Sequence, residues 1–282
     1  MQSPSQPQSY IFVIVLFCTV AFSQSFQYTT LQVPGSSYTV ALGINNSGQI
    51  VGSFVVNDKQ SGFLYSGGSF QTIACPNSSF TIAQGINDSG VIVGWCDPTG
   101  SAQGFIYQNG NFAYLNYPGS TLTALMGVND LGDIVGVYQL GSQFGFVYRN
   151  GVFKTLGTAR SANGINQSET IAANICGARC HGIVKAKTKK GWTVVQKVQY
   201  PGAASTGLGG INDNGDLSGA WGPTQDGQQE GFVYFKDTNT FFGFNIQHSP
   251  DMEVTGINNS RQVVGFYGTG SGLHGFYGTV SE

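Results

Sequence analysis

Charged residues are scarce in this chain. Only 9% of its 282 residues are Asp, Glu, Lys or Arg, and the formal net charge is −2. Because there is no basic excess, we predict neither nucleic acid nor an anionic membrane as a partner. Aromatic residues reach 13%, whereas disordered chains contain few of them. The composition therefore predicts a folded and nearly neutral protein.

Helical periodicity and the common catalytic strings are also missing. No stretch has a convincing 3.6-residue apolar period, and no Gly-x-Ser-x-Gly elbow, P-loop or His-Glu-x-x-His string occurs. The 42 glycines instead suit many short strands joined by tight turns. We therefore expect an all-β protein, and the sequence names no catalytic residue and no cofactor.

The first 25 residues have the pattern of a signal peptide. Residues 11–22 form an apolar run too short to span a bilayer, and small residues follow at Ser23 and Ser25. No Lys or Arg precedes the run, which departs from the usual pattern, and a membrane anchor is the alternative. Because stop-transfer charges are missing, we expect cleavage and a mature chain of residues 26–282, secreted or periplasmic, without a membrane span.

Four cysteines remain after such cleavage: Cys75, Cys96, Cys176 and Cys180. An even count in an exported chain favours disulfides, and four cysteines allow three pairings. A bridge across a hairpin between Cys176 and Cys180 would leave Cys75 to pair with Cys96. A zinc site is the competing interpretation, but no Cys-x-x-Cys pair occurs and the three histidines lie far apart, so we predict no metal.

One phrase, Gly-Ile-Asn-x-x-Gly-x-Ile-Val-Gly, recurs six times with variations. Its copies begin at Gly43, Gly85, Gly127, Gly164, Gly210 and Gly256. A second phrase, Gly-Phe-x-Tyr in its full form, follows each copy after 18 to 21 residues, and a short aromatic run closes most units. Each unit thus contains four β-like runs, and the starts are 42, 42, 37, 46 and 46 residues apart. Four strands at this period are typical of a propeller blade.

The two ends of the chain complement each other. The sixth copy stops after its third run, at residues 275–277, whereas residues 26–34 look like an isolated fourth run. Tyr28, Leu31 and Pro34 keep the spacing of the fourth run in the second copy. We therefore predict a six-bladed β-propeller with four antiparallel strands per blade, whose last blade is completed by the N-terminal strand. An open solenoid would need capping repeats instead.

These repeats resemble the bacterial HAF family of extracellular repeats. That family has Gly-Ile-Asn-x-x-Gly-x-Ile-Val-Gly followed by His-Ala-Phe-x-Tyr. The first half is kept here, whereas His-Ala-Phe is replaced by forms such as Ser-Gly-Phe, and only residues 274–276, His-Gly-Phe, come near it. The resemblance extends from about Phe26 onward. It implies export and a repeat fold, and it implies no catalytic residues.

The turn after each Gly-Ile-Asn has two interpretations. Residues 129–133 and 212–216 read Asn-Asp-x-Gly-Asp, which resembles part of a calcium loop. Calcium needs six to eight oxygen ligands, and the first and sixth copies have no carboxylate here. Asn and Gly both tolerate positive φ, so we expect structural turns.

Two sets of loops are expected to meet on one face of the ring. One set joins each fourth strand to the next blade, and the other joins the second and third strands. Propellers bind ligands through such loops and the central channel. The candidate ligand-binding residues from these loops are Asp58, Asp97, Arg160, Arg179, His181, Asp226 and Asp251. Four aromatic residues near this rim suit sugars or peptides, although packing between blades explains them as well: Trp95, Tyr138, Trp221 and Tyr267.

A non-catalytic binding module for an extracellular carbohydrate, peptide or protein is the function that this pattern favours. The competing hypothesis is an extracellular lyase or hydrolase, which would need groups such as Arg160, His248 and Asp251 to converge at the channel mouth. His181 and His274 occupy other repeat positions, so we expect surface histidines. The lysines between Lys185 and Lys190 predict a solvated hairpin rather than a nucleic-acid patch.

Overall fold

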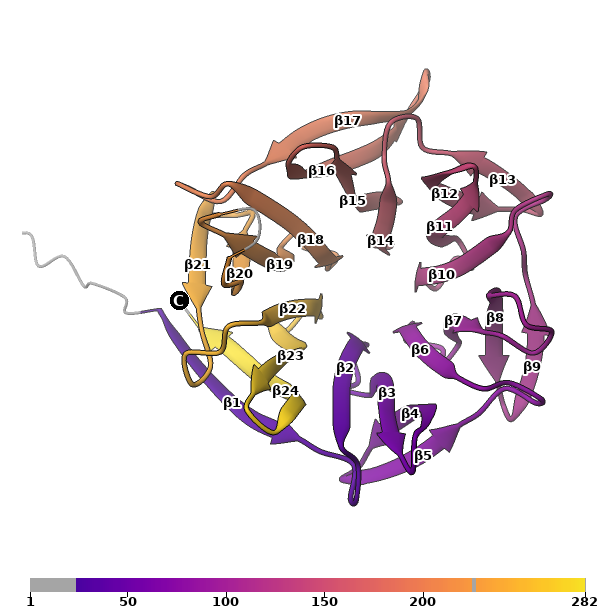
Figure 1. Ribbon diagram of the computed structural model, residues 1–282. Helices are drawn as coiled ribbons and strands as arrows, with labels where there is room; N and C mark the ends of the chain where they lie inside the picture. The colour runs from indigo at the N-terminus through magenta and orange to yellow at the C-terminus, as the bar shows by residue number, and fades with distance from the viewer. Residues whose placement is uncertain (1–23, 225–226, 282) are drawn as a thin grey trace, which may run out of the picture.

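The computed structural model describes residues 24–224 and 227–281. Its strands form six four-stranded antiparallel sheets, arranged as blades around a central axis (Figure 1). The first five blades are β2–β5, β6–β9, β10–β13, β14–β17 and β18–β21, and the sixth contains β22, β23, β24 and β1. The predicted six-bladed β-propeller is therefore confirmed. None of the described residues belongs to a helix long and apolar enough to cross a membrane.

The strands have the following bounds. The first three blades consist of β2 (Tyr38–Ile44), β3 (Ile50–Val56), β4 (Lys59–Ser66), β5 (Ser69–Ile73), β6 (Thr81–Ile86), β7 (Ile92–Cys96), β8 (Gln103–Gln108), β9 (Asn111–Tyr114), β10 (Leu122–Val128), β11 (Ile134–Leu140), β12 (Ser142–Arg149) and β13 (Val152–Thr155). The last three consist of β14 (Ser161–Ile165), β15 (Thr170–Cys176), β16 (Cys180–Thr188), β17 (Gly191–Val198), β18 (Ser205–Ile211), β19 (Leu217–Gly222), β20 (Glu230–Phe235), β21 (Thr240–Phe244), β22 (Met252–Ile257), β23 (Gln262–Thr269), β24 (Gly272–Ser281) and β1 (Ser25–Leu31).

The N-terminal strand closes the ring as predicted. β1 pairs antiparallel with β24, from Ser25 opposite Ser281 to Leu31 opposite Gly275, and the two strands lie side by side at the outer edge of the sixth blade (Figure 1). The strand begins at Ser25, one residue before the expected start of the mature domain. Residues 1–23, which contain most of the predicted signal peptide, lie outside the described residues.

Glycines allow the blades to approach closely near the axis. A Cβ atom on Gly43 would lie 2.8 Å from the carbonyl oxygen of Gln84 and 3.1 Å from the Cα atom of Gly85, both in the next blade. Real side chains do not tolerate such contacts with backbone, which explains why the repeat begins with glycine. Close packing between neighbouring blades therefore depends on glycine at this position.

The aromatic residue of Gly-Phe-x-Tyr forms the core of each blade. Its side chain is fully buried in five blades, at Phe63, Phe105, Phe146, Phe232 and Phe276. The fourth blade has Ile183 at this register, also buried. Burying a Phe side chain contributes about 1.5–3 kcal/mol to stability. The buried residue at this position therefore stabilises each blade.

The asparagine of Gly-Ile-Asn links each blade to the next. Each side-chain Nδ2 donates to the backbone carbonyl of the corresponding asparagine one blade further, at 3.0–3.1 Å, and the ring closes on itself. The six residues are Asn45, Asn87, Asn129, Asn166, Asn212 and Asn258. Each Oδ1 also accepts from the backbone N–H four residues later, across the turn. The expected turn is confirmed, and the same residue additionally binds neighbouring blades together.

A second ring surrounds the first. At the residue after each asparagine, the backbone N–H donates to a side-chain oxygen of the corresponding residue in the next blade, at 2.7–3.2 Å. These residues are Asn46, Asp88, Asp130, Gln167, Asp213 and Asn259. The carboxylates of this ring therefore hold backbone donors of the protein itself, which accounts for the acidic residues in the turns.

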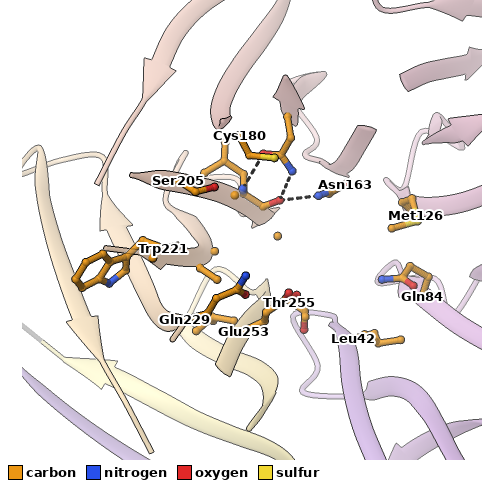
Figure 2. A pocket seen from close by; sticks show the side chains of 18 of the residues that line it. Leu42, Gln84, Met126, Asn163, Cys180, Ser205, Trp221, Gln229, Glu253 and Thr255 are labelled. Carbon is orange, nitrogen blue, oxygen red and sulfur yellow. Dashed lines mark hydrogen bonds between the residues drawn. The ribbon is translucent and has the colours of Figure 1, made fainter. Parts of the chain in front are cut away.

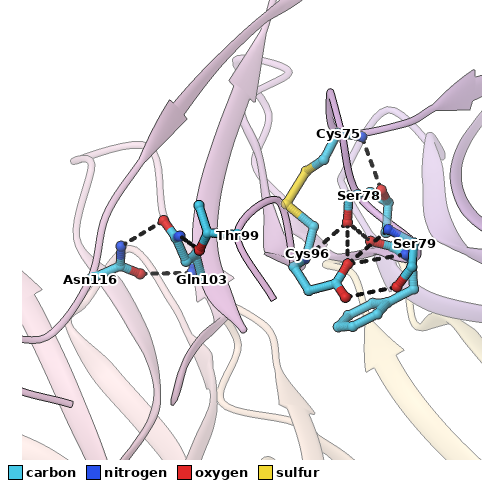
Figure 3. Close-up of a disulfide and its surroundings, with 11 residues drawn as sticks. Cys75, Ser78, Ser79, Cys96, Thr99, Gln103 and Asn116 are labelled. Carbon is cyan, nitrogen blue, oxygen red and sulfur yellow. Dashed lines mark hydrogen bonds between the residues drawn. A yellow bond between two sulfur atoms is a disulfide. The ribbon is translucent and has the colours of Figure 1, made fainter. Parts of the chain in front are cut away.

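Two disulfides lie in different blades of the ring, one at blade two and one in blade four. Cys75 pairs with Cys96 (Figure 3). Cys176 pairs with Cys180 across the hairpin between β15 and β16, so the suggested pairing is confirmed. Both belong to loops on one end of the blades. Disulfides persist in oxidising compartments, which agrees with a location outside the cytoplasm.

Candidate ligand-binding site on the loop face

Two sets of loops meet at one end of every blade, and we call this end the loop face. In the third blade the N–H of Thr121 donates to the carbonyl of Gln139 at 2.9 Å, and in the fifth Ala204 donates to Gly222 at 2.9 Å. Each bond joins the loop before a first strand to the end of the second strand. The predicted meeting of the two loop sets is thus confirmed. The opposite end, with the tight turns, is the turn face.

A β-bulge points one residue of each blade into the central channel. The pairing between first and second strands shifts at the residue before the glycine of Gly-Ile-Asn in all six blades. Bulges redirect a side chain out of the regular pleat. The six bulge residues, all partly exposed, are Leu42, Gln84, Met126, Asn163, Gly209 and Thr255, and all six line the channel.

The channel opens on the loop face into a polar cavity of about 310 Å³ (Figure 2). Blades four to six supply most of its wall, including Ser205, Trp221, Gln229 and Glu253. The bulge residues form its floor, and in Figure 2 Thr255, Leu42, Gln84, Met126 and Asn163 surround the central opening. Ligand pockets of proteins begin at about this size.

A second cavity, of about 390 Å³, adjoins the first over blades one to three. The two cavities share Leu42, Gln84 and Met126. The wall of the second cavity is mostly apolar, and it includes Tyr38, Val40, Ile82, Trp95, Leu122 and Val137. The loop face therefore has a continuous depression with one polar half and one apolar half, which we call the loop-face pocket.

Glu253 lies where the two halves meet. Its side chain is half-buried and lines the polar cavity, whereas Phe266, its partner in strand pairing, lines the apolar cavity. Burial raises the pKa of the Glu253 carboxyl, and the nearby negative charge of Asp251 adds to the effect. Burial also raises the pKa of the Tyr38 phenol, and the charge of Glu253 acts in the same direction.

Several polar groups of this pocket have no partner within the described part of the chain. The Glu253 carboxyl makes no hydrogen bond or ion pair there. The buried Oδ1 of Asn163 and the buried indole N–H of Trp221 likewise have none. Buried polar groups in folded proteins are nearly always satisfied, so exceptions indicate a site for a ligand or water. The Glu253 carboxyl is thus available to a molecule in the polar cavity, whereas the other two atoms are buried within the protein.

Asp97, a predicted ligand-binding residue, is held by the loop between β5 and β6, whose Ser78 and Ser79 lie beside the disulfide in Figure 3. Its carboxylate accepts from the hydroxyls of Ser78 at 2.6 Å and Ser79 at 2.7 Å, and from the N–H of Ser79 at 2.9 Å. These bonds, the Ser78 hydroxyl first, lower the pKa of Asp97 to about 2. The arrangement gives Asp97 a structural function beside the Cys75–Cys96 disulfide.

The enzyme hypothesis requires Arg160, His248 and Asp251 to act together. In the described part of the chain, these three residues form no hydrogen bond or ion pair with one another. Arg160 donates to the carbonyl of Gln143 at 3.1 Å and lies over the ring of Phe144. His248 is exposed in the loop between β21 and β22, and Asp251 ends that loop. Neither cavity of the loop-face pocket is lined by these three residues.

Asp58, Arg179 and His181 lie in or beside the loops between second and third strands, outside the walls of both cavities. Asp58 occupies the tight turn between β3 and β4, and Arg179 lies in the hairpin closed by the Cys176–Cys180 disulfide. His181 is exposed and hydrogen-bonds with Gln199 through its Nδ1 at 2.8 Å. Asp226 lies outside the described residues. As ligand contacts, these residues stay predictions.

The four aromatic residues of the rim divide between packing and the pocket. Tyr138 and Tyr267 are buried, and Tyr138 stacks on Tyr117 with ring centroids 3.6 Å apart. Trp95 and Trp221 pack against their own neighbours but also line the loop-face pocket. Packing between elements therefore explains the tyrosines fully and the tryptophans in part.

Comparison of the six repeats would have singled out Glu253, which the sequence analysis missed. Three residues before the glycine of Gly-Ile-Asn, the blades have Val40, Ile82, Ala124, Ser161, Gly207 and Glu253. Glu253 is the one charged residue at this register. A charge at a position that is otherwise small or apolar has no structural use in the repeat, and this signal was available from the sequence.

Metal coordination gains no support from the turns. In the described ranges, no group of three or more His, Cys, Asp or Glu side chains is arranged to hold a metal ion. The buried carboxylate of Asp216 accepts from the N–H of Lys236 at 2.9 Å and from Nε of Arg261 at 3.1 Å. Its oxygens are thus engaged by donors of the protein.

Comparisons with known proteins identify the fold and no family. No protein-family model matches the sequence, and no curated protein matches it. Among solved structures, a protein assigned as a gluconolactonase has a TM-score of 0.57 at 12% identity over 91% of this chain and 92% of its own. A catalytically inactive virginiamycin B lyase from Staphylococcus aureus with quinupristin has a TM-score of 0.51 at 12% identity, over 90% and 99%. A Bacteroides fragilis protein assigned as exported has a TM-score of 0.53 at 8% identity, over 92% and 96%. At such identities the likeness extends to the fold alone.

Proposed function

We propose that the protein is an exported, non-catalytic binding module that takes up an extracellular carbohydrate, peptide or protein through its loop face. The observation that carries the proposal is the Glu253 carboxyl, which lines the polar cavity and has no hydrogen-bond or ion-pair partner among the described residues. A ligand with a hydrogen-bond donor would satisfy this carboxyl.

Of these ligand classes, a short peptide fits best. Its backbone amides match the amide and hydroxyl side chains of the polar half, such as Gln84, Gln229 and Ser205. An apolar side chain of the peptide would then lie against Ile82 and Trp95 in the apolar half. A neutral sugar would leave most of that apolar wall in contact with water, which is unfavourable.

A peptide-display screen against the mature chain tests this function. We expect enriched peptides to carry an apolar residue and a basic or amide group, and to change the fluorescence of the tryptophans. Glu253→Gln is expected to weaken binding of these peptides about tenfold. Asp58→Asn removes one charge outside both cavities and is expected to leave the affinity unchanged. Equal weakening by both variants, or absence of any enriched peptide alongside a positive glycan array, contradicts the peptide assignment.

The second candidate is an extracellular lyase or hydrolase, and one observation favours it. A carboxyl with a raised pKa in a pocket is typical of a general acid, and Glu253 has this property at the channel mouth. Among the described residues that line the polar cavity, there is no His, Lys, Arg or Asp that could act as a second acid–base group. Turnover of a polymer that is abolished in Glu253→Gln but retained in Asp58→Asn would establish the enzyme instead.

A further inference from the structure

Positive charge is concentrated in one sector of this nearly neutral chain. Nine of its twelve Lys and Arg residues lie between Arg149 and Lys197, where Glu169 is the one acidic residue. The other thirteen acidic residues lie outside this range. In the structure the range runs from the end of β12 through β17, which is the outer edge of blade three and the whole of blade four.

A cavity of about 350 Å³ lies in this sector, between blades three and four. It lies toward the turn face, because Asn150 belongs to the turn between β12 and β13. It is therefore separate from the loop-face pocket. Its wall combines three cations with an aromatic and an aliphatic surface: Arg149, Lys154, Lys187, Trp192, Val147 and Val152.

Two carboxylates partly neutralise these cations. Asp133 lies 3.6 Å from Nε of Arg149. Glu169 forms ion pairs with Arg149 and, at 3.3 Å, with Lys187. The ammonium group of Lys154 forms no ion pair or hydrogen bond with any described residue. Lys189 and Lys190 add two exposed charges at the tip of the hairpin between β16 and β17. The cavity thus keeps an excess of positive charge that the protein does not compensate.

We propose that this cavity binds acidic sugar residues of an extracellular polysaccharide. The ammonium groups of Lys154 and Lys187 face the carboxylate or sulfate, and the half-buried Trp192 offers its ring to the C–H face of the sugar. The apolar wall of Val147 and Val152 beside the cations matches a ligand that is charged on one edge and apolar on one face. A lipid surface would bind a convex patch of cations. The concave site with an aromatic wall therefore favours a sugar over a membrane.

Titration calorimetry of the mature chain with oligogalacturonate tests the proposal, and the methyl-esterified oligomer serves as the neutral control. We expect binding of the acid form that weakens with added salt, and no binding of the ester. Lys154→Ala with Lys187→Ala is expected to weaken binding about tenfold. Lys59→Ala with Lys236→Ala removes the same charge outside the sector and leaves the affinity unchanged.

Two further variants separate binding from folding. Glu169 has a positive φ of 56°, where four other copies of the repeat have glycine, so Glu169→Gly removes one of the two competing carboxylates while keeping the turn. We expect it to strengthen binding of the acid oligomer severalfold. Trp192→Ala is expected to weaken binding about tenfold, whereas Trp192→Phe, which keeps an aromatic ring, stays within about threefold.

Several outcomes would overturn the assignment. They are absence of binding to oligogalacturonate, equal affinity for its ester, and equal weakening in both double-lysine variants. Binding to phosphatidylglycerol vesicles or duplex DNA that is as tight as to the oligomer, and insensitive to Trp192→Ala, identifies a general anion patch and contradicts a sugar site. Because the loop-face pocket is distant in the fold, Glu253→Gln leaves this binding intact, so failure of either proposal is separately visible.

Discussion

The side-chain amide of Asn258 donates a hydrogen bond to the backbone carbonyl of Asn45 at 3.1 Å, across 213 residues of sequence. These residues belong to the last and the first blade, so this bond completes the inner ring of asparagines. At the outer edge of the same sixth blade, β1 pairs with β24. The propeller is thus closed twice, once near the axis by a side chain and once at the circumference by a strand.

Substitution of Asn258 by alanine is expected to reduce the free energy of unfolding by about 1–3 kcal/mol, because it leaves the buried carbonyl of Asn45 and turn N–H groups without partners. Denaturant unfolding measures the change. Asn111→Ala, an exposed asparagine with one local bond, is the control and should have little effect. Equal effects of the two substitutions would falsify the closing function of Asn258.

Moving the N-terminal strand to the other end of the chain is expected to preserve the fold. Ser281 lies opposite Ser25, with their hydroxyls 2.7 Å apart, so a short turn can join them and give the sixth blade a regular fourth strand. In the permuted chain, residues 25–34 follow residue 281. We expect its free energy of unfolding to lie within about 1 kcal/mol of that of the parent.

Deletion of residues 24–34 provides the contrast to that permutation. It exposes the edge of β24 and removes the buried side chains of Leu31 and Val33, so we expect aggregation during refolding. Light scattering and size-exclusion chromatography report both results. A soluble, fully stable deletion variant is incompatible with closure by β1.

The two disulfides are expected to contribute unequally to stability. Cys75 and Cys96 are 21 residues apart, whereas Cys176 and Cys180 are only 4 apart. Loop-closure entropy predicts losses of about 3.3 and about 1.9 kcal/mol when each pair is replaced by alanine. Calorimetry of the two double variants measures the order. A reversed order means that packing around the cysteines, rather than chain entropy, dominates.

Asp97 is expected to make stability sensitive to acid. Its folded pKa of about 2 lies below the ordinary Asp value of about 3.9, so its contribution is present above about pH 4 and is lost as the pH falls toward 2. Asp97→Asn removes this titration. The difference in melting temperature between parent and variant should therefore shrink between about pH 4 and pH 2. A difference that is independent of pH assigns the effect to geometry alone.

Glu253 is expected to act in the opposite direction. Its folded pKa is raised, so the folded state disfavours the charged carboxylate, and stability falls as the pH rises from the ordinary carboxyl range through the raised pKa. Glu253→Gln should therefore be more stable than the parent at pH 7 and equal to it at pH 3. A less stable variant at pH 7 would show that the carboxylate has a partner. Stability sacrificed at one residue is typical of a binding site.

Repeated residues made the fold predictable from sequence. Six copies of Gly-Ile-Asn and the matching ends of the chain predicted blades and closure, because each repeat position meets the same environment. Asn45 and its equivalents, however, were interpreted only as turn residues. Their bonds to the next blade span 37 to 46 residues, and to the first blade 213, so no local pattern indicates them.

The binding site was less predictable, because it consists of the positions at which repeats differ. Asp58, Asp97 and Arg160 were chosen as charged loop residues, yet Asp97 is occupied by Ser78 and Ser79, and Arg160 packs on Phe144. Glu253 lies within a strand, where the sequence analysis sought only structure. The cationic cavity likewise joins Lys154 of β13 to Lys187 of β16, which face each other only across neighbouring blades.

The amino-acid sequence by itself determined the number of blades, the strand that closes them and the plausible disulfide pairs, since these depend on spacing and repetition along the chain. Only the tertiary structure decided which side chains converge. The bulge residues, Glu253 and the lysines of blade four come from segments far apart in sequence, and the closure of the ring, rather than any local preference, sets the distances between them.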